Sequence, residues 1–456
     1  MSTALEGART VVLGVGKSGL SAVRLLRSQG AQVVALDRKP EAELADEAAA
    51  LKALGAELRA GGEIPEGLVE SARLVVVSPG VPPTHPALQC AREREVEVVG
   101  EVELAYRFLE PSRPLVGITG TNGKSTTTAL CGQMFEESGL EAFVGGNLGL
   151  PLSESVLSGK RWDAHVVELS SFQLETVKEF RCSAAAVTNL TPDHLDRYAT
   201  PKEYADAKRH IFASQTPEDA AVVNADDPAA VELAREGKGR LYGFTLEERL
   251  DLSRHRFAGG AVATAEGFRF LDGRSFQLSN RALRGAHNKQ NAMAAALLGA
   301  LSGVIDRGIQ EGLNRFPGLP HRLEVVRKMD GVEWINDSKA TNVDSAVVAL
   351  RALEGGVWLI AGGQGKGAPY APLVEAARGK VKGVLTIGQD APAIAEAFQG
   401  VAEVVPCQTL DRAVEEAFRR VRKWEVVLLS PACASYDQFK NFSERGDCFR
   451  RLVKEL

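Results

Sequence analysis

The stretch LVGITGTNGKSTTTAL, residues 115–130, limits the possible folds of this chain more than any other segment. It runs from an apolar strand through a loop of glycine and threonine into a helix that begins near Lys124. Such a loop cradles phosphate, because its backbone N–H groups and the helix N-terminus point at the anion. The general pattern has glycine where this chain has Ile118, but Gly117 and Gly120 flank that position. The loop, here called the phosphate loop, is therefore a variant form.

The same rhythm of short apolar strand, turn and amphipathic helix repeats in three blocks of the chain. Proline-bearing breaks near FLEPSRPL and RFPGLPHR separate the blocks, and the second block also contains RFAGGAVATAEGFRFL, which predicts a hairpin. A chain of 456 residues suits roughly three domains of about 150 residues each. The rhythm is typical of parallel sheets covered by helices. We predict an α/β protein with domains at 1–109, 110–318 and 319–456.

Composition argues against several classes of protein. A net charge of -5 disfavours general nucleic-acid binding, because that affinity depends on clustered lysine and arginine. The six cysteines lie far apart without a C-x-x-C pair, which indicates reduced thiols rather than a disulfide framework or a zinc site. The chain opens without a basic segment followed by a long apolar stretch, and no later run is long enough to span a bilayer. We expect a cytoplasmic monomer with no membrane or nucleic-acid partner.

The segment GVGKSG places Gly14, Gly16 and Gly19 in a G-x-G-x-x-G pattern between a strand and a helix, with Asp37 about 20 residues later. The glycines allow a tight turn and let backbone N–H groups approach a pyrophosphate. Taken alone, the pattern favours a nicotinamide-dependent oxidoreductase, and it is also compatible with glycine serving only a close helix–strand crossing. It predicts ligand binding and leaves the identity of the diphosphate open.

Side chains that follow strands of the second block are predicted to meet at the phosphate loop. Lys124 would contact the β- and γ-phosphates, and the hydroxyls of Ser125 and Thr126 would reach Mg²⁺ or phosphate. Glu168 ends the strand in AHVVELSS, and His194 follows the strand in AAAVTNL. Because the carboxyl ends of parallel strands gather at one edge of a sheet, these groups should converge there. A carboxylate and an imidazole facing a triphosphate are suitable Mg²⁺ ligands.

Loops of the third block carry cationic and hydroxyl side chains with few carboxylates. They lie in HRLE, NDSKATN, GGQGKG and SPACASYDQFKNF, and the last two segments again follow strands. This composition suits an anionic ligand. The candidate residues are His321, Arg322, Asp337, Lys339, Thr341, Lys366, Ser435 and Phe442.

Six segments together resemble a known family over nearly the whole chain: GITGTNGKST, ELSSFQLE, DHLDRY, GLPHR, WINDSKATN and SPACASYDQFKNFSERG. They are similar to the Mur ligases of peptidoglycan synthesis, and the last two most resemble the members that add D-glutamate. The resemblance implies N-terminal and C-terminal Rossmann-like domains that flank a central ATPase-type mononucleotide-binding domain. It implies that the first domain binds UDP, the central one ATP and Mg²⁺, and the last the amino acid. The implied substrates are UDP-N-acetylmuramoyl-L-alanine and D-glutamate.

The resemblance also assigns residues to the two nucleotide sites. By this analogy GVGKSG holds UDP rather than a nicotinamide, and the nucleotide-sugar site comprises Gly16, Ser18, Asp37, Arg38, Ser78, Gly80 and Asn147. The ATP site comprises Gly120, Thr121, Asn122, Gly123, Lys124, Ser125, Thr126, Asn288, Asn291, Arg322 and Asp337. The implied ligands of two Mg²⁺ ions are Ser125, Glu168, His194 and Lys208.

Lys208 is an ordinary surface lysine of a helix when its surroundings in the sequence are considered alone. The resemblance implies instead that it carries a carbamate, which turns a cation into a metal-binding anion. The implied catalytic set is Lys124, Glu168, His194, Lys208, His321 and Lys339, and the D-glutamate site comprises Thr341, Lys366, Ser435, Tyr436 and Phe442. Tyr436 departs from the family, which often has an aliphatic residue at this position.

The implied reaction activates a carboxylate by phosphorylation and then forms an amide through an acyl-phosphate and a tetrahedral intermediate. Three alternatives remain from the sequence. A folylpolyglutamate synthetase would share the ATP-binding core but would lack a nucleotide-binding first domain of this kind. An NAD-dependent oxidoreductase would use GVGKSG and leave the phosphate loop unexplained. A non-catalytic ATP-binding module would not need Glu168, His194 and Lys366 together.

Overall fold

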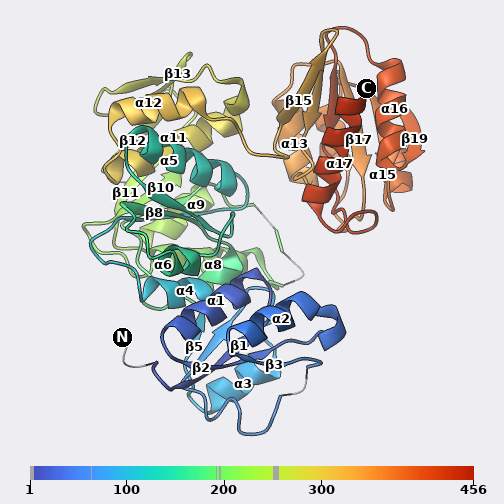
Figure 1. The fold of residues 1–456 in the computed structure, drawn as a ribbon. Coiled ribbons are helices and arrows are strands. Elements are labelled where there is room, and N and C mark those ends of the chain that lie inside the picture. Colours follow the sequence, from blue (N-terminus) through green and yellow to red (C-terminus); the bar gives the residue numbers. More distant parts are fainter. Residues whose placement is uncertain (1–4, 63, 192, 195–196, 250–255) are drawn as a thin grey trace. The chain divides into compact units, whose positions relative to one another are not determined.

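The computed structural model describes residues 5–62, 64–191, 193–194, 197–249 and 256–456. The chain forms two compact units. The N-terminal unit comprises Met1–Leu278 with Gln290–Asn314, and the C-terminal unit comprises Ser279–Lys289 with Arg315–Leu456. The N-terminal unit contains two of the three sheets and the C-terminal unit contains the third (Figure 1).

The first sheet is parallel throughout and has the order β3-β2-β1-β4-β5. Its strands are β1 (Arg9–Leu13), β2 (Gln32–Leu36), β3 (Glu57–Arg59), β4 (Leu74–Val77) and β5 (Val98–Gly100). Its helices are α1 (Lys17–Ser28), α2 (Ala45–Ala53), α3 (Pro86–Glu93) and α4 (Glu101–Tyr106), with a 3₁₀ turn, η2 (Glu41–Glu43). Strand β4 is wholly apolar and buried, and β1 is apolar and buried over Val11–Leu13, as burial on both faces of a parallel sheet requires.

Glycine in GVGKSG sets how closely α1 approaches β1. A Cβ atom on Gly19 would lie 1.9 Å from the carbonyl oxygen of Gly14, so no larger residue fits without moving the helix. Gly14 itself has a φ of +82°, which favours glycine. The close helix–strand crossing, which was the alternative interpretation of these glycines, is therefore present.

The second sheet has nine strands in the order β14-β13-β12-β11-β10-β9-β6-β8-β7. The strands are β6 (Leu115–Thr119), β7 (Ala142–Gly146), β8 (Ala164–Glu168), β9 (Ala184–Val187), β10 (Ala220–Asn224), β11 (Arg240–Thr245), β12 (Gly259–Ala263), β13 (Gly267–Phe270) and β14 (Ser275–Gln277). Strands β6 to β12 pair in parallel, and β13 and β14 add antiparallel pairs. The predicted hairpin is the pair β12–β13.

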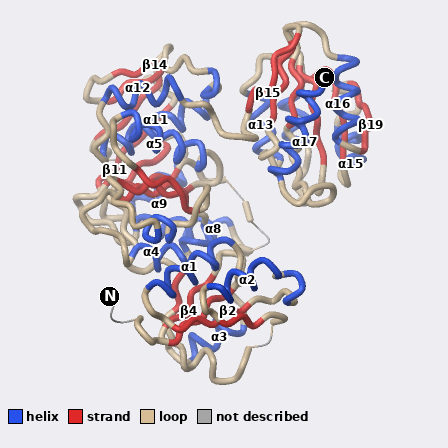
Figure 2. The backbone as a smooth tube through the Cα atoms, in the orientation of Figure 1, coloured by secondary structure: helices blue, strands red, loops and turns tan. Residues whose placement is uncertain are grey.

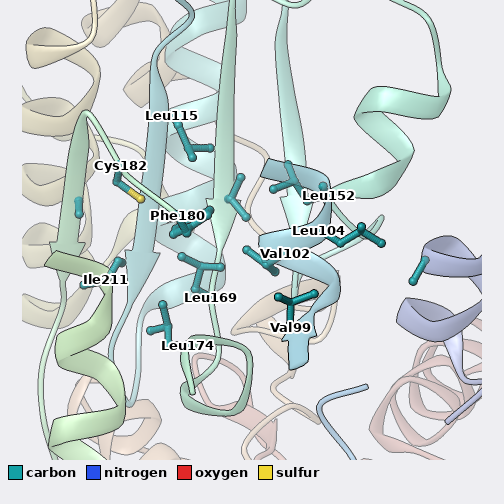
Figure 3. Close-up of a cluster of buried hydrophobic side chains, with 14 of the residues drawn as sticks. Val99, Val102, Leu104, Leu115, Leu152, Leu169, Leu174, Phe180, Cys182 and Ile211 are labelled. Atoms are coloured by element: carbon teal, nitrogen blue, oxygen red, sulfur yellow. The ribbon is translucent and has the colours of Figure 1, made fainter. Parts of the chain in front are cut away.

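Helices follow most strands of the second sheet, as the sequence rhythm predicts. They are α5 (Lys124–Glu137), α6 (Ser153–Leu157), α7 (Ser171–Leu174), α8 (Pro201–Arg209), α9 (Pro228–Arg235), α11 (Ala286–Leu301) and α12 (Asp306–Arg315), with the 3₁₀ turns η3 (His210–Phe212) and η4 (Arg281–Leu283). One cluster of buried side chains runs from the first sheet into the second (Figure 3). It includes Val99 and Val102 from the first and Leu115, Leu169 and Phe180 from the second. Each such side chain contributes about 1.5–3 kcal/mol when fully buried, so the two sheets stabilise each other.

The third sheet, in the C-terminal unit, has the order β15-β16-β20-β17-β18-β19. Its strands are β15 (Glu324–Met329), β16 (Val332–Asn336), β17 (Val357–Gly362), β18 (Val381–Ile387), β19 (Glu403–Gln408) and β20 (Val426–Leu429). Its helices are α13 (Val343–Arg351), α14 (Ala371–Ala377), α15 (Ala391–Ala397), α16 (Leu410–Arg420) and α17 (Phe442–Glu455). Only β15 is antiparallel to its neighbour.

Helices cover both faces of this third sheet (Figure 2). Successive strand residues point to opposite faces, and Leu359 and Ile360 of β17 belong to different buried clusters. The cluster around Leu359 includes side chains of α13, α14 and α15, and the cluster around Ile360 includes side chains of α16 and α17. This is a doubly wound sheet, in which ligands bind beyond the carboxyl ends of the strands.

The predicted α/β class, with a phosphate loop in the sheet that follows the first Rossmann-like sheet, is confirmed. The exact domain bounds at 1–109, 110–318 and 319–456 stay a prediction. No helix within the described ranges is long and apolar enough to cross a bilayer.

Candidate functional site

The phosphate loop joins β6 to α5 through two glycines that no other residue could replace without strain. Gly120 and Gly123 have φ values of +142° and +86°. A Cβ atom would lie 2.0 Å from the hydroxyl of Thr188 at the first position and 2.3 Å from Asn291 Oδ1 at the second. The bare backbone leaves the loop close to its neighbours, and no acidic residue stands in the first turn of α5. Both features suit an anion at the helix N-terminus.

The loop is fixed by hydrogen bonds to the segment after β9. The Asn122 N–H donates to Asn189 Oδ1 at 2.9 Å, and the Thr121 hydroxyl donates to the Thr191 carbonyl at 3.0 Å. Lys124 folds back so that its Nζ donates to the carbonyl oxygens of Gly120, at 2.9 Å, and Thr121, at 2.7 Å. The side chain of the predicted phosphate-binding lysine therefore lies against the backbone of the phosphate loop.

Lys208 of α8 is buried, so its description as a surface lysine is wrong. Only 1% of the residue is exposed, and its Nζ donates to the Gly120 carbonyl at 2.9 Å and to the Thr119 hydroxyl at 3.4 Å. The Gly120 oxygen thus accepts from both Lys124 and Lys208, which places the two amines side by side. Burial, and then the positive charge of Lys124, holds the pKa of Lys208 well below its usual value.

Glu168 lies at the end of β8, and its two carboxylate oxygens differ in their hydrogen bonding. Its Oε1 accepts from Asn147 Nδ2 at 2.7 Å. Its Oε2 is buried and has no hydrogen-bond partner in the part of the chain that the structure describes. A buried carboxylate oxygen without a partner is costly, and a divalent cation would supply the missing contact. The donor set at this edge therefore fits Mg²⁺.

His194 lies in a turn after β9 and has a left-handed backbone with a φ of +54°. Its ring makes an edge-on contact with Phe172, at 4.8 Å between centroids, and lies 6.2 Å from the ring of Tyr204. The neighbouring residues 195–196 of DHLDRY lie outside the described residues. Groups of three or more histidine, cysteine, aspartate and glutamate side chains that could hold a metal are absent from the described ranges. The predicted metal set is not of that kind, because it includes Ser125 and Lys208.

A pocket of about 500 Å³ lies at the carboxyl end of the first sheet. Asp37 fixes the turn beside it, because its carboxylate accepts from the N–H of Val15 at 2.9 Å and of Lys39 at 3.0 Å. The Ser78 hydroxyl donates to the Gly14 carbonyl at 2.8 Å. The pocket is lined by the predicted nucleotide-sugar residues Gly16, Ser18, Asp37, Arg38, Ser78 and Gly80. Lys17, Lys39 and His85 also line it and were missed, because a single lysine or histidine carries no distinctive sequence signal.

In the C-terminal unit, His321 and Asp337 are held by neighbouring strands. His321 has a φ of +63°, and its Nδ1 lies 3.0 Å from Asn336 Nδ2. Asp337 accepts from the Ser430 hydroxyl at 2.8 Å and the Leu323 N–H at 3.2 Å, and burial raises its pKa to about 7. His287, which precedes the predicted ATP residue Asn288, is half-buried, and desolvation, followed by the charge of Arg322, lowers its pKa to about 4. Asn291, the other asparagine of this pair, belongs to the N-terminal unit.

Several predicted amino-acid-site residues gather at the start of α17. The Lys339 Nζ lies 5.4 Å from the centroid of the Phe442 ring, and that ring makes an edge-on contact with His321 at 6.1 Å. The Thr341 N–H donates to the Lys339 carbonyl at 2.9 Å. Ser435 is buried, whereas Lys366 and Tyr436 are exposed. The loops that carry Lys366 and Ser435 are adjacent, because the backbones of residues 364 and 434 exchange two hydrogen bonds.

Arg445 of α17 is a residue of this site that the sequence did not reveal. Only 1% of it is exposed, and its guanidinium donates to the Ser338 hydroxyl at 3.0 Å and to the carbonyls of Ser338, Cys433 and Ala434. It ties the loop after β16 to the loop after β20. Arginine in a helix with three other basic residues is usually solvated, so only the tertiary contacts show its burial.

Comparisons with known proteins bear on the whole chain. Residues 8–100 match a family model for the Mur ligase MurD-like N-terminal domain, 118–299 the Mur ligase middle domain, and 321–433 the Mur ligase glutamate ligase domain. A Myxococcus xanthus protein named UDP-N-acetylmuramoylalanine–D-glutamate ligase is 57% identical, with 100% of both chains covered. A protein of the same name from Anaeromyxobacter dehalogenans is 52% identical, covering 99% of this chain and 98% of its own.

Solved structures agree on the fold. The UDP-N-acetylmuramate–alanine ligase of Thermotoga maritima has a TM-score of 0.61 at 20% identity, covering 98% of this chain and 99% of its own. E. coli FolC, in complex with DHPP and ADP, has a TM-score of 0.56 at 16% identity over 78% of this chain and 92% of its own. Domain models along the whole chain, full-length relatives and the phosphate loop after the Rossmann-like sheet lead to one conclusion: the chain belongs to the Mur ligase family.

Proposed function

We propose that this protein is an ATP-dependent ligase that joins D-glutamate to UDP-N-acetylmuramoyl-L-alanine in peptidoglycan precursor synthesis. The observation that carries the proposal is the presence, in one compact unit, of a pocket of about 500 Å³ and of a phosphate loop beside Glu168, whose buried Oε2 has no hydrogen-bond partner among the described residues. An oxidoreductase would need only the first of these. The full-length relatives named as D-glutamate ligases support the identity of the two substrates.

The chemistry explains why both nucleotide sites are needed. A carboxylate is a poor electrophile, because its charge repels an amine and oxide is a poor leaving group. Transfer of the γ-phosphoryl group of ATP removes that charge and gives an acyl-phosphate, which the amine of D-glutamate attacks to form a tetrahedral intermediate that expels phosphate. Lys124 and Arg322 would neutralise the negative charge that moves during both steps, so catalysis consists mainly of positioning and charge stabilisation.

The proposed metal ligands are Ser125, Glu168, His194 and Lys208, for two Mg²⁺ ions. Bound Mg²⁺ supplies charge neutralisation at the transferring phosphoryl group. The unpartnered Glu168 Oε2 and the buried Lys208 amine support this assignment. Neutral Lys208 would attack CO₂ through Nζ and lose one proton, which leaves a carbamate anion, and its lowered pKa favours the neutral amine that this step requires.

The remaining assignments follow the same proposal. The pocket of the first sheet holds UDP through Gly16, Ser18, Asp37, Arg38, Ser78 and Gly80, and Asn147 contacts the sugar-linked portion. ATP contacts the phosphate loop together with Asn288, Asn291, Arg322 and Asp337. His321 and Lys339 lie near the reacting carboxyl, and D-glutamate is held by Thr341, Lys366, Ser435, Tyr436 and Phe442. The enzyme acts in the cytoplasm as a monomer, without membrane or nucleic-acid partners.

A phosphate-release assay tests the proposal directly. Purified protein, Mg·ATP and UDP-N-acetylmuramoyl-L-alanine are mixed with D-glutamate, L-glutamate, D-glutamine or L-alanine in parallel. We expect release with D-glutamate and at least tenfold lower kcat/KM with D-glutamine and L-alanine, because a lost charged hydrogen bond is worth roughly 1.5–3 kcal/mol. L-glutamate should also be a poor substrate, because inversion at the α-carbon cannot keep the amine and both carboxylates in place together. Equal turnover of D-glutamate and L-alanine would overturn the proposal. A titration monitoring nicotinamide fluorescence covers the oxidoreductase alternative, for which binding would be the positive result.

A further inference from the structure

Arg197, in the DHLDRY segment, has contacts that the proposed function does not use. Its guanidinium forms a two-point ion pair with Glu175, with Nη2–Oε2 at 2.5 Å and Nε–Oε1 at 3.2 Å. The hydroxyl of Tyr198 also donates to Glu175. Both side chains of the ion pair are mostly buried, with 15% of Arg197 and 23% of Glu175 exposed. This geometry fixes the guanidinium plane rather than leaving it in solvent.

The third nitrogen of Arg197 reaches the wall of the nucleotide-sugar pocket. Nη1 donates to the carbonyl of Val81 at 3.3 Å and approaches that of Pro79 at 3.5 Å. Both residues line the pocket of about 500 Å³, in the same loop as Ser78 and Gly80. Arg197 therefore holds the backbone of that loop from outside the pocket.

The other face of Arg197 is connected to His194. The guanidinium carbon lies 4.4 Å from the centroid of the Phe172 ring, and the same ring contacts the His194 imidazole at 4.8 Å. The N–H groups of Arg197 and Tyr198 both donate to the His194 carbonyl at 3.0 Å. The backbone and the ring of His194 are thus in contact with the residues that hold the pocket loop.

The contacts of Arg197 favour a positioning role over direct binding of phosphate. Each of its three guanidinium nitrogens already donates to a carboxylate or a backbone carbonyl within the N-terminal unit. A positioning role is compatible with all of the contacts.

We propose that Arg197 is a positioning residue that couples occupancy of the nucleotide-sugar pocket to the position of His194 beside the phosphate loop. The inference rests on the proposed function, because it assumes that the two sites bind UDP-N-acetylmuramoyl-L-alanine and Mg·ATP. A substrate that fixes the conformation of the pocket loop thereby fixes the positions of Arg197, Phe172 and His194. Coupling of this kind is reciprocal, so each ligand tightens the other by the same factor.

Calorimetric titration of the full chain with UDP-N-acetylmuramoyl-L-alanine, with and without Mg²⁺ and a non-hydrolysable ATP analogue, measures the coupling. In the parent we expect the analogue to tighten binding at least fivefold, within the usual range of about 5–150-fold. Arg197→Lys keeps the charge but loses the planar fork. In the Arg197→Lys variant the coupling should fall below twofold, and the affinity for each ligand alone should stay within threefold of the parent. Its kcat should fall about tenfold or more, with an unchanged KM for D-glutamate, because misplaced groups slow the chemical step.

Arg24→Lys is the matched control. Arg24 of α1 also bridges the two sheets of this unit, through Glu154 of α6 at 3.3 Å, but it lies in neither loop. Its coupling should equal that of the parent. Phe172→Leu removes the ring between Arg197 and His194 and should also abolish the coupling, which keeps the test informative if Arg197→Lys does not fold.

Two results would overturn the inference: a parent without measurable coupling, or folded Arg197→Lys and Phe172→Leu variants that retain it within twofold. Failure of the proposed function has a different signature, because phosphate release by the parent would then not depend on D-glutamate.

Discussion

The phosphate-loop edge of the second sheet and the C-terminal loops after β17 and β20 both combine lysines with hydroxyls, yet they hold their side chains differently. At the phosphate-loop edge, Glu168 and Lys208 are buried and bound to fixed backbone or side-chain groups. In the C-terminal loops the backbones are paired, but Lys366 and Tyr436 are exposed.

The two regions therefore differ in how much of their arrangement is fixed before a ligand binds. Burying a charged group is costly unless its partners are in place, so the phosphate-loop edge is arranged in advance for one demanding ligand set. Exposed side chains cost little and are ordered by the ligand when it binds. Substitutions at the first region should therefore abolish the chemistry, and those at the second should weaken binding of one substrate.

The largest effect is expected at Glu168. Glu168→Ala removes the buried carboxylate and should lower kcat by about 10³-fold or more, since charge stabilisation by a bound metal contributes several kcal/mol. The variant should fold, because the only hydrogen bond lost among the described residues is the one from Asn147 Nδ2 to Oε1. Phosphate release at saturating Mg²⁺ provides the measurement, with Glu141→Ala, an exposed position at the start of β7, as the control. Near-parental turnover would remove Glu168 from the site.

Lys208 should rank second, because a small molecule is able to replace part of its function. Lys208→Ala should lose at least about 100-fold in activity and regain part of it with added formate or acetate, which supply a carboxylate in place of the carbamate. Stripping bicarbonate from the parent should also lower its activity. The control is Lys202→Ala, on the same helix but with 84% of its side chain exposed. A Lys208→Ala enzyme as active as the parent would rule out the carbamate.

Lys366 tests the exposed region. Lys366→Ala should raise the KM for D-glutamate about tenfold, the lower end of the range for a charged hydrogen bond, and leave the KM for the nucleotide sugar within twofold. Lys440→Ala, an exposed lysine after the other C-terminal loop, should change neither value. Initial rates across a D-glutamate series decide between them. A fall in kcat with unchanged KM would mean that the two regions do not differ as argued.

The contrast between these regions also marks what the sequence could predict. Gly123 and Lys124 were predictable, because a phosphate loop is a local pattern whose residue spacing carries the geometry. The burial of Lys208 was not, because its partner is the carbonyl of Gly120, 88 positions earlier. Arg197 and Arg445 were hidden for the same reason: an arginine in a polar segment is usually solvated, and only the assembled fold supplies the carbonyls that bind it.

The smallest effect on activity is expected at Glu101, at the start of α4. A substitution there tests how burial of a carboxyl group affects the stability of the fold. Burial raises the pKa of Glu101 to about 7, although the Ser153 N–H donates to it at 2.6 Å. The folded pKa of Glu101 lies above the unfolded value of 4.5. Below about pH 4.5 the side chain is protonated in both states, so burial of the neutral acid costs no ionisation energy. The protein loses stability as the pH rises towards 7, because only the folded state has to keep the proton. At about 1.4 kcal/mol per unit, the loss is at most about 3 kcal/mol.

Glu101→Gln, which cannot ionise, should therefore unfold at higher urea concentration than the parent at pH 8, and the difference should shrink towards pH 5. Turnover should stay within twofold, because Glu101 lies outside the proposed catalytic groups. A urea midpoint difference that does not change between pH 5 and pH 8 would show that Glu101 is already ionised in the folded protein at pH 5. The fold would then accommodate the buried carboxylate in its charged form.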